Sequence, residues 1–585
     1  MNAEGVELSQ QNAQARWKIA GGNVAGAKSL AQELSLSPVV AQLLLNRGFS
    51  SADSARKFLR PSLDDLFDPE SLDGVDVAVA RISKAIARGE RILIYGDYDV
   101  DGMTSAALLH HLFALLSARV SFFLPRRIEE GYGVNAESLR SFKEQGINLV
   151  ITADCGIGAA EEAKLAAQLG IDLIVTDHHE PEGPMPEAVA VINPKKRGSK
   201  YPYRDLAGVG VAFKLAWAAA KSFSGQKKVS PEFREFLLNA VGLVALGTIA
   251  DVAPLTGENR IFAAHGLSAL ANTRLPGIRA LMTVAGINES FTSRDVAYRL
   301  APRLNATGRL NEPILGLELL TTESFGRAME IARQLDEKNR ERQAIERTIL
   351  AAARKRILSN KDFNNQRVIV LANDGWHVGV IGIVASRLAE EFYRPTVLMN
   401  LEGEVAKGSA RSIPPFHIFE ALKSCDDLLL SYGGHAQAAG MAVEACKVEA
   451  LREALEAAAR RLSEDDFTPT VSLDAEIRLS DVTASLVRQL DNLAPFGEGN
   501  PQPLFAAKNL SIAGRLKRVG TDGQHLAFFV KSDKTITRAI AFGWGDFTPR
   551  LENHRGTISV ACEPQINTYG GAQEVQLVVR DIRLD

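Results

Sequence analysis

Three aspartates at alternate positions follow a short apolar run early in the chain. The stretch RILIYGDYDVDG, residues 91–102, carries Asp97, Asp99 and Asp101 where a strand pattern gives way to a helical one. Like charges disfavour one another's ionised forms, whereas a divalent cation with oxygen ligands favours all three. The alternative is an acidic turn that caps the following helix. A calcium loop of the EF-hand type is excluded, because the twelfth position from Asp97 is Leu108 and not Glu.

Further acidic and imidazole groups follow other apolar runs. Asp154 follows LVITA, and Asp251 follows GLVALGTIA. Asp177, His178 and His179 follow the run LIVT. In a doubly wound sheet, ligand sites lie beyond the carboxyl ends of the strands, so these turns are expected to meet in one crevice. Each group alone is explained by a cap or a surface turn, but together they predict a polynuclear metal site.

The types of ligand indicate the metal and the chemistry. The set is rich in carboxylates, with one or two imidazoles and no thiolate, which suits Mn²⁺ or Mg²⁺ and favours Mn²⁺ once a histidine binds. Two such ions bridged by a carboxylate hold a phosphoryl group and activate a water for in-line attack. The residues therefore predict hydrolysis of a phosphate ester with two ions as cofactors.

Length and composition set the frame for this site. The chain has 585 residues and is 46% hydrophobic, which predicts a globular protein of several domains. Its 4 cysteines lack CxxC spacing, which fits the cytoplasm and excludes a disulfide framework and a cysteine-rich zinc site. No signal peptide and no run of about 20 apolar residues is visible, so no membrane association is expected. A net charge of -3 neither supports nor excludes a nucleic-acid partner.

Apolar runs alternate with helical periods from residue 91 onward, which is typical of an α/β fold with a doubly wound, mostly parallel sheet. Strands are expected at 91–96, 120–125, 147–156, 171–179 and 189–194. A long, highly charged helix is expected over 323–358, followed by a second α/β domain and a C-terminal β-barrel of OB type. The expected domains are an N-terminal helical segment at 1–60, the metal-bearing domain at 61–320, the connecting helix at 321–360, the second α/β domain at 361–466 and the barrel at 467–585.

Two segments outside the metal site predict contacts to phosphate groups or to a nucleic-acid strand. In APRLNATGRL, residues 301–310, Arg303 and Arg309 flank an Asn305-x-x-Gly turn, which favours a shaped phosphate site over a merely solvated helix face. In the barrel, basic residues at 515–518 accompany the pair Phe528 and Phe529, as on surfaces that bind single strands. Strand alternation buries one phenylalanine of the pair, so only the other is expected to stack on a base.

The motifs form one ordered string. From about residue 58 to the C-terminus, the chain carries GDYDVDGMTSA, TADCGI, TDHH, GTIADVAPL, APRLNATGRL, WHVGVIGIVASRL, GSARS and GGHAQAAG. The chain resembles the DHH phosphoesterase family, whose name comes from the motif seen here at residues 177–179. Within that family it is similar to the bacterial exonucleases specific for single-stranded DNA. The order of the motifs makes the resemblance specific, whereas the tripeptide alone is weak.

The resemblance implies a role for each matching residue. The catalytic residues would be Asp97, Asp99, Asp101, Asp154, His178, His179 and Asp251. All but His179 would hold metal, with Asp154 as the bridging carboxylate, while His179 would touch the scissile phosphate and Asp177 would orient an imidazole. The substrate-binding residues would be Arg303, Asn305, Arg309, Ser409, Arg411, Gly433, Gly434 and His435. The last three match the motif of the second α/β domain, DHHA1, although a tight turn with a surface histidine is the alternative.

The resemblance also implies an activity and its setting. The expected activity is 5′→3′ degradation of single-stranded DNA to mononucleotides in DNA repair and recombination. Single-strand-binding protein and a RecQ-type helicase are the expected protein partners, and the expected state is a cytoplasmic monomer. One alternative is a DHH phosphodiesterase acting on oligonucleotides, cyclic dinucleotides or pyrophosphate, which would need no barrel. The other is an inactive strand-binding scaffold, which would have no reason to keep the aspartates and histidines.

Overall fold

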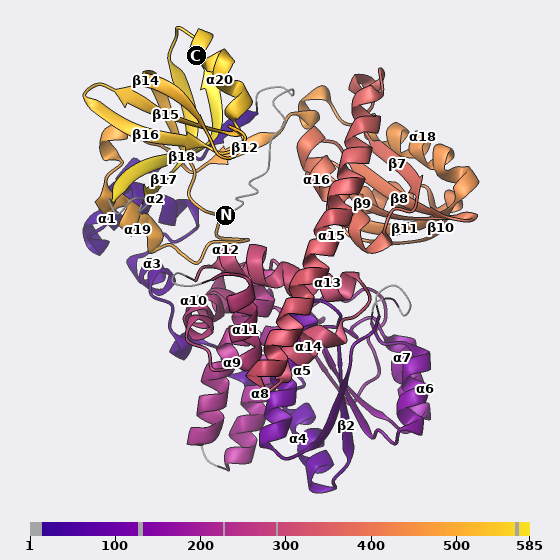
Figure 1. The fold of residues 1–585 in the computed structure, drawn as a ribbon. Coiled ribbons are helices and arrows are strands. Elements are labelled where there is room, and N and C mark those ends of the chain that lie inside the picture. Colours follow the sequence, from indigo (N-terminus) through magenta and orange to yellow (C-terminus); the bar gives the residue numbers. More distant parts are fainter. Residues whose placement is uncertain (1–14, 127–130, 132, 226–227, 288–290, 568–572) are drawn as a thin grey trace. The chain divides into compact units, whose positions relative to one another are not determined.

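The computed structural model describes residues 15–585 apart from 127–130, 132, 226–227, 288–290 and 568–572 (Figure 1). The chain divides into two compact units. One comprises Arg60–Gln343 together with Pro495–Pro501. The other comprises Ala344–Ala494, Gln502–Asp585 and the residues that precede Arg60.

A five-stranded, all-parallel sheet organises the first unit, with strand order β3-β2-β4-β5-β6. Its strands are β2 (Arg91–Gly96), β3 (Arg119–Phe123), β4 (Leu149–Ala153), β5 (Asp172–Thr176) and β6 (Ala190–Ile192). All five expected strands are present. The continuous apolar runs of β2 and β4 fit this arrangement, because the central strands are buried on both faces.

Helices cover both faces of this sheet and extend it into a helical block. They are α4 (Val75–Ala87), α5 (Val100–Leu115), α6 (Ala136–Glu144), α7 (Ala160–Gln168), α8 (Gly208–Ser224), α9 (Pro231–Ala250), α10 (Gly257–Ala271), α11 (Pro276–Val284), α12 (Ser293–Asp295), α13 (Ala301–Arg309) and α14 (Ile314–Thr321). Ile92 and Ile94 face the core formed with α4, α5, α8 and α9, while Leu93 and Tyr95 face the core formed with α6 and α7. By length and composition α9 could cross a membrane, but 67% of its apolar window is buried inside the domain, so it is a core helix.

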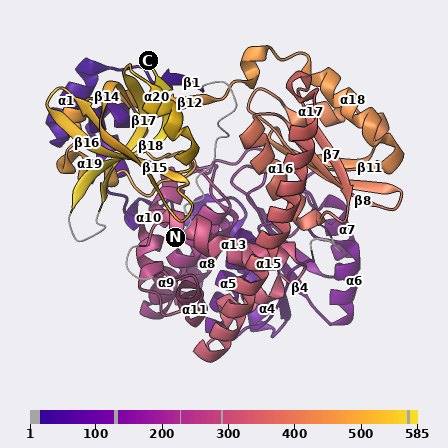
Figure 2. The ribbon, with the colours of Figure 1, turned by 45° about the horizontal axis from the view of Figure 1, so that its top comes forward.

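The long helix α15 (Phe325–Ser359) confirms the expected connector. It leads into a second α/β domain, seen in Figure 2 with β7, β8 and β11 labelled. The strand order of its sheet is β10-β11-β9-β8-β7, in which β7 and β8 pair in parallel and the other neighbours pair antiparallel. The strands are β7 (Ile369–Asp374), β8 (Thr396–Glu402), β9 (Val405–Arg411), β10 (Leu429–Gly434) and β11 (Ala438–Glu444). The helices are α16 (Val378–Phe392), α17 (Ile418–Lys423) and α18 (Val448–Ala459).

The C-terminal strands close into the expected barrel. Its strands are β14 (Phe505–Val519), β15 (His525–Ser532), β16 (Thr535–Ala541), β17 (Ile558–Asn567) and β18 (Glu574–Leu584). They run in the order β14-β15-β16-β18-β17, and β17 pairs back with β14. Accompanying elements are β13 (Ala475–Glu476), α19 (Ala484–Asp491) and α20 (Thr548–Asn553).

The N-terminal segment contains the expected helices and one unexpected strand. The helices are α1 (Val24–Leu34), α2 (Pro38–Asn46) and α3 (Ala52–Leu59). Ahead of them, β1 (Arg16–Ile19) pairs in parallel with β12 (Thr470–Leu473). Segments far apart in the sequence, one ahead of α1 and one ahead of the barrel, therefore share one small sheet.

A short segment between α19 and β14 belongs to the first unit. This segment, Pro495–Pro501, is called the strap below. The Glu498 carbonyl accepts a hydrogen bond from the Leu255 amide at 2.7 Å. The Phe496 carbonyl accepts one from the Ser293 hydroxyl at 2.6 Å. The strap thus fixes the loop that follows α9 and the start of α12.

Candidate active site

The predicted acidic and imidazole residues meet at the carboxyl edge of the parallel sheet. Asp97 and Asp99 follow β2, Asp154 follows β4, and His178 and His179 follow β5. Asp101 lies in the first turn of α5. Asp251 arrives at the C-terminal end of α9, and thus from a helix and not from a strand.

These side chains form three overlapping groups. Within each group, the possible ligand atoms all lie within 4.8 Å of one another. The groups are Asp97–Asp99–Asp154, Asp101–His178–Asp251 and Asp154–His178–His179. Asp154 belongs to the first and third groups, and His178 to the second and third. The groups Asp97–Asp99–Asp154 and Asp101–His178–Asp251 therefore offer two neighbouring positions for cations, and Asp154 Oδ1 lies 3.2 Å from His178 Nε2 of the second group.

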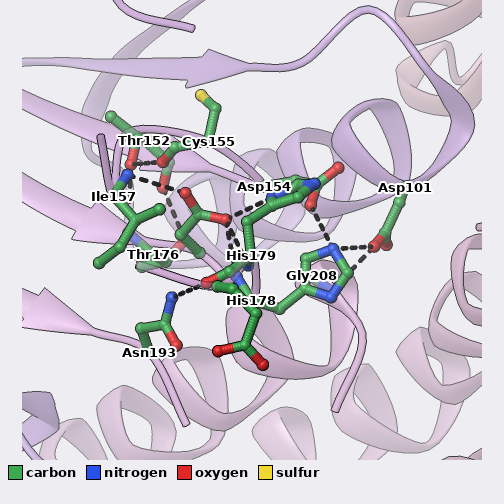
Figure 3. A network of polar contacts seen from close by, with 12 residues as sticks. Asp101, Thr152, Asp154, Cys155, Ile157, Thr176, His178, His179, Asn193 and Gly208 are labelled. Carbon is green, nitrogen blue, oxygen red and sulfur yellow. Dashed lines mark hydrogen bonds and ion pairs between the residues drawn. The ribbon is translucent and has the colours of Figure 1, made fainter. Parts of the chain in front are cut away.

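The imidazole of His178 lies between the carboxylates of Asp154 and Asp101 (Figure 3), and a third carboxylate, Asp251, is also close. Its Nε2 lies 3.2 Å from Asp154 Oδ1, 3.7 Å from Asp251 Oδ2 and 3.9 Å from Asp101 Oδ2. Burial and the neighbouring His179 lower the pKa of His178 to about 3, so the ring is neutral and offers a lone pair. Among the described residues, neither His178 Nε2 nor Asp154 Oδ1 has a hydrogen-bond partner. Buried atoms of this kind fit a metal ion.

The carboxylates carry the electrostatic signature of a site built for positive charge. Burial and neighbouring carboxylates raise the pKa values of Asp101 and Asp154 well above the ordinary range. Burial and the charge of Asp99 raise the pKa of Asp251 to about 7. Cations placed among these groups would remove the repulsion that opposes their ionisation.

Asp154 has a backbone conformation that is rare for its residue type. Its φ of 67° lies in the left-handed region, which costs a non-glycine residue free energy and clusters at functional sites. The Asp154 amide donates to the Thr176 carbonyl at 3.0 Å, which anchors the turn to β5. A Cβ on Gly208 would lie 2.4 Å from Asp154 Oδ1. The start of α8 therefore leaves room for this carboxylate only because residue 208 is glycine.

Asp101 is held by the N-terminus of α8. Its two carboxylate oxygens accept hydrogen bonds from the amides of Gly208 and Val209, each at 2.8 Å. A Cβ on Gly247 of α9 would lie 2.7 Å from Asp101 Oδ1. These three residues were not among the sequence predictions. The glycines of AGVGVAF and ALGTIA were the available signal, since glycine permits such close approach.

Asp177 orients the neighbouring histidine. Its Oδ1 accepts from the His179 ring at Nδ1 at 2.7 Å and from the His179 amide at 3.1 Å, while its Oδ2 accepts from the Ile157 amide at 2.8 Å. Burial alone would lower the pKa of His179, but the hydrogen bond and charge of Asp177 outweigh it and raise the pKa to about 9. His179 is therefore cationic at neutral pH.

An open cavity of about 340 Å³ adjoins these ligands. Its lining consists of Asp97, Tyr98, Asp99, His179, Ala250, Asp251, Asn305, Gly308 and Arg309. The structure thus brings predicted phosphate-binding residues of α13 to the metal ligands. Arg303 has other contacts, because its guanidinium donates to Asp336 at 2.9 Å and to the Arg299 carbonyl at 2.6 Å.

The predicted substrate residues of the second α/β domain share one end of its sheet. Ser409 and Arg411 lie on the same side of β9, and Arg411 Nη1 donates to Ser409 Oγ at 3.0 Å. Arg411 pairs with Ala438 of β11, and the Ala438 carbonyl accepts from the His435 amide at 2.8 Å. The β10–β11 hairpin therefore places His435 beside the strand end that carries Arg411.

Gly434 has a structural reason to be glycine. Its φ is 142°, and an added Cβ would lie 2.4 Å from the Ala438 carbonyl oxygen. Gly433 has nothing within 4 Å of an added Cβ. The close approach that the double glycine predicts is therefore needed at the second position, within the hairpin itself.

Known proteins match this chain over nearly its whole length. Family models match at residues 91–248 (DHH family, N-terminal domain), 365–464 (DHHA1 domain) and 473–581 (RecJ OB domain). The single-stranded-DNA-specific exonuclease RecJ of Bacillus subtilis strain 168 is 39% identical over 97% of this chain and 70% of its own length. The protein of that name from Escherichia coli strain K12 is 33% identical over 94% of this chain and 96% of its own length. This chain belongs to the RecJ family.

A solved RecJ structure supports the same assignment. RecJ of Thermus thermophilus, determined in complex with Mn²⁺, superposes with a TM-score of 0.83 at 32% identity, covering 97% of this chain and 79% of that one. The expected fold class, a DHH domain with a parallel sheet, a DHHA1 domain and an OB barrel, is confirmed.

Proposed function

We propose that this chain is a metal-dependent exonuclease that degrades single-stranded DNA 5′→3′ to mononucleotides in DNA repair and recombination. The observation that carries the proposal is the pair of neighbouring ligand groups, Asp97–Asp99–Asp154 and Asp101–His178–Asp251, beside an open cavity with Arg309 in its wall. Membership of the RecJ family supports the substrate and the direction. The alternatives, a small-substrate phosphodiesterase and an inactive scaffold, gain no support from the relatives described above.

The residues present fit two Mn²⁺ or Mg²⁺ ions. Asp97, Asp99 and Asp154 would hold one ion, and Asp101, His178 and Asp251 the other. Asp154, whose Oδ1 lies 3.2 Å from His178 Nε2, would be the carboxylate between them. When bound, the ions polarise a phosphoryl oxygen and activate a water for in-line attack. Oxygen ligands with a single neutral imidazole suit these metals.

The protein's own groups bind and orient the phosphate. His179, held by Asp177, would donate its second ring N–H to a phosphate oxygen and stabilise the charge that develops there. Arg309 and Asn305 line the same cavity and would fix the terminal nucleotide. A phosphate contact of Arg303 would require it to leave Asp336, so Arg309 is the better supported of the two arginines.

The second α/β domain and the barrel would bind the strand. Ser409, Arg411, Gly433, Gly434 and His435 would form a clamp for the terminal nucleotide, supported by the shared end of their sheet. In the barrel, Phe529 is 46% exposed on β15 while Phe528 is buried, so Phe529 would stack on a base. Recruitment by single-strand-binding protein or a RecQ-type helicase, a monomeric state and a cytoplasmic location belong to the same proposal and rest on the family resemblance.

One experiment tests the activity, its strandedness and its polarity together. Purified protein with Mn²⁺ is given oligonucleotides labelled at the 5′ or the 3′ end, single-stranded or duplex. We expect immediate release of labelled mononucleotide only from the 5′-labelled single strand. Asp154→Asn, which keeps the shape of the side chain, is the matched control for a contaminating nuclease. Internal cleavage products or equal attack on blunt duplex would refute the proposal.

A further inference from the structure

An exposed tyrosine lies on the helix that leads into the cavity. Tyr298 belongs to the π-helical turn η3 (Val296–Leu300), which joins α12 to α13. Its side chain is 69% exposed, so it contributes little to the core. The guanidinium carbon of Arg294 lies 5.7 Å from the centroid of its ring, within reach of a cation–π interaction. A flat aromatic face supported by a positive charge is thereby presented to solvent.

The tyrosine shares a helix face with residues of the cavity wall. Tyr298, Pro302, Asn305 and Arg309 follow one another at intervals of about three or four residues, the spacing of one helix face. Asn305 and Arg309 line the cavity. At a rise of about 1.5 Å per residue, Tyr298 stands about 10 Å along the axis from Asn305. A strand with about 3.4 Å between nucleotides covers that distance in about three steps, and an extended strand in fewer.

The support beneath Tyr298 is firmly anchored. Thr292 and Asp295 form a reciprocal capping box at the start of α12. Arg299 donates to Asp295 at 3.0 Å and to the carbonyls of Ala285 and Gly286 at 2.6 and 2.7 Å. Arg299 therefore serves the fold, whereas Arg294 contacts the exposed ring. A π-helical turn is rare and is frequently found at functional sites.

We propose that Tyr298, backed by Arg294, stacks on a base of the strand whose terminal nucleotide occupies the cavity, about two or three nucleotides away. The inference rests on the proposed function and deepens it by naming a positioning residue for the substrate. Stacking tolerates any sequence, because every base has a π-face. It therefore suits an enzyme that must accept each nucleotide in turn, and the phosphate of that strand complements the charge of Arg294.

The dependence on substrate length distinguishes base stacking by Tyr298 from a structural role, which would affect short and long substrates alike. We compare Tyr298→Ala and Tyr298→Phe with wild type on a thymidine dinucleotide and on a hexanucleotide, with Mn²⁺ saturating. Tyr298→Ala should raise KM for the hexanucleotide about ten- to a hundred-fold, the range for loss of one stacked base. Turnover of the dinucleotide, whose second base is only one step from the terminal nucleotide and does not reach residue 298, should stay near wild type. Tyr298→Phe, which keeps the ring, should behave as wild type on both substrates.

An abasic scan locates the contact without relying on a variant. Removing one base at a time from the hexanucleotide should raise KM of the wild-type enzyme most at one internal position, and that increase should vanish in Tyr298→Ala. The inference is overturned if removal of each base raises KM in Tyr298→Ala as much as in the wild type. It is also overturned if Tyr298→Ala raises KM equally for the hexanucleotide and the dinucleotide. Failure of the wild type to degrade either substrate would instead refute the proposed function.

Discussion

Removal of the metal should destabilise the protein more at alkaline than at acidic pH. Without cations, the pKa of Asp251 is raised from 3.8 to about 7. A raised pKa means that protonation stabilises the metal-free fold. This stabilisation is complete below the unfolded value and is lost as the pH rises through about 7. Between about pH 5.5 and 8.5 the loss from Asp251 alone is about 2 kcal/mol, because stability falls by about 1.4 kcal/mol per pH unit well below pH 7 and levels off above it.

Asp101 and Asp154 act in the same direction, since their pKa values are also raised. The ions hold all three carboxylates ionised, so the stabilisation gained from Mn²⁺ should grow across this interval. A change of about 2 kcal/mol corresponds to about 4–8 °C in Tm for a domain of this size. The assay is thermal unfolding with Mn²⁺ or with chelator at about pH 5.5 and 8.5. Asp251→Asn should show a smaller difference. The reasoning would be refuted if the increase in Tm caused by Mn²⁺ were equal at both pH values or larger at the acidic one.

Three further outcomes are expected. Asp154→Asn should abolish hydrolysis while single-strand binding persists, and a tenth of the wild-type rate at saturating Mn²⁺ would contradict its bridging role. Arg411→Ala and His435→Ala should each lower kcat/KM by about two orders of magnitude with both metals still bound in calorimetry; loss of an Mn²⁺ site would place the residue among the ligands instead. Phe529→Ala should weaken binding of long single strands by about 1–3 kcal/mol with unchanged Tm. Phe528→Ala should instead lower the free energy of unfolding by about 3–5 kcal/mol. The reverse pattern would show that the face of β15 that carries Phe528 binds the strand.

The sequence predicted the parts of this protein that depend on local pattern. Strands, turns and the carboxylates after them are near one another in the chain, and the parallel topology brings the turns to one edge. The same pattern left the two arginines of α13 unresolved. Arg303 and Arg309 are six positions apart, which leaves them about 120° apart around a helix, so only one can face the cavity. The packing partner that decides between them, Asp336, lies on another helix.

Contacts between distant segments were not predictable for a different reason. The strand β1 has only four residues, too few to reveal its period, and its partner β12 is distant in the sequence, at Thr470–Leu473. The amides of Gly208 and Val209 that hold Asp101 are backbone groups of a kind that nearly every residue possesses. Only the folded path of α8 shows that these two are used.

The strap limits how the enzyme can be divided into parts. A truncation after residue 466 that aims to remove only the barrel also removes Pro495–Pro501. The Leu255 amide and the Ser293 hydroxyl would then lose their acceptors, each at a cost of about 1–3 kcal/mol where water cannot replace them. Leu255 lies four residues after Asp251 and Ser293 five before Tyr298, so catalysis would suffer even if the barrel had no part in it. The barrel is therefore not an independent module, and its contribution is measured cleanly only in a deletion that retains residues 495–501.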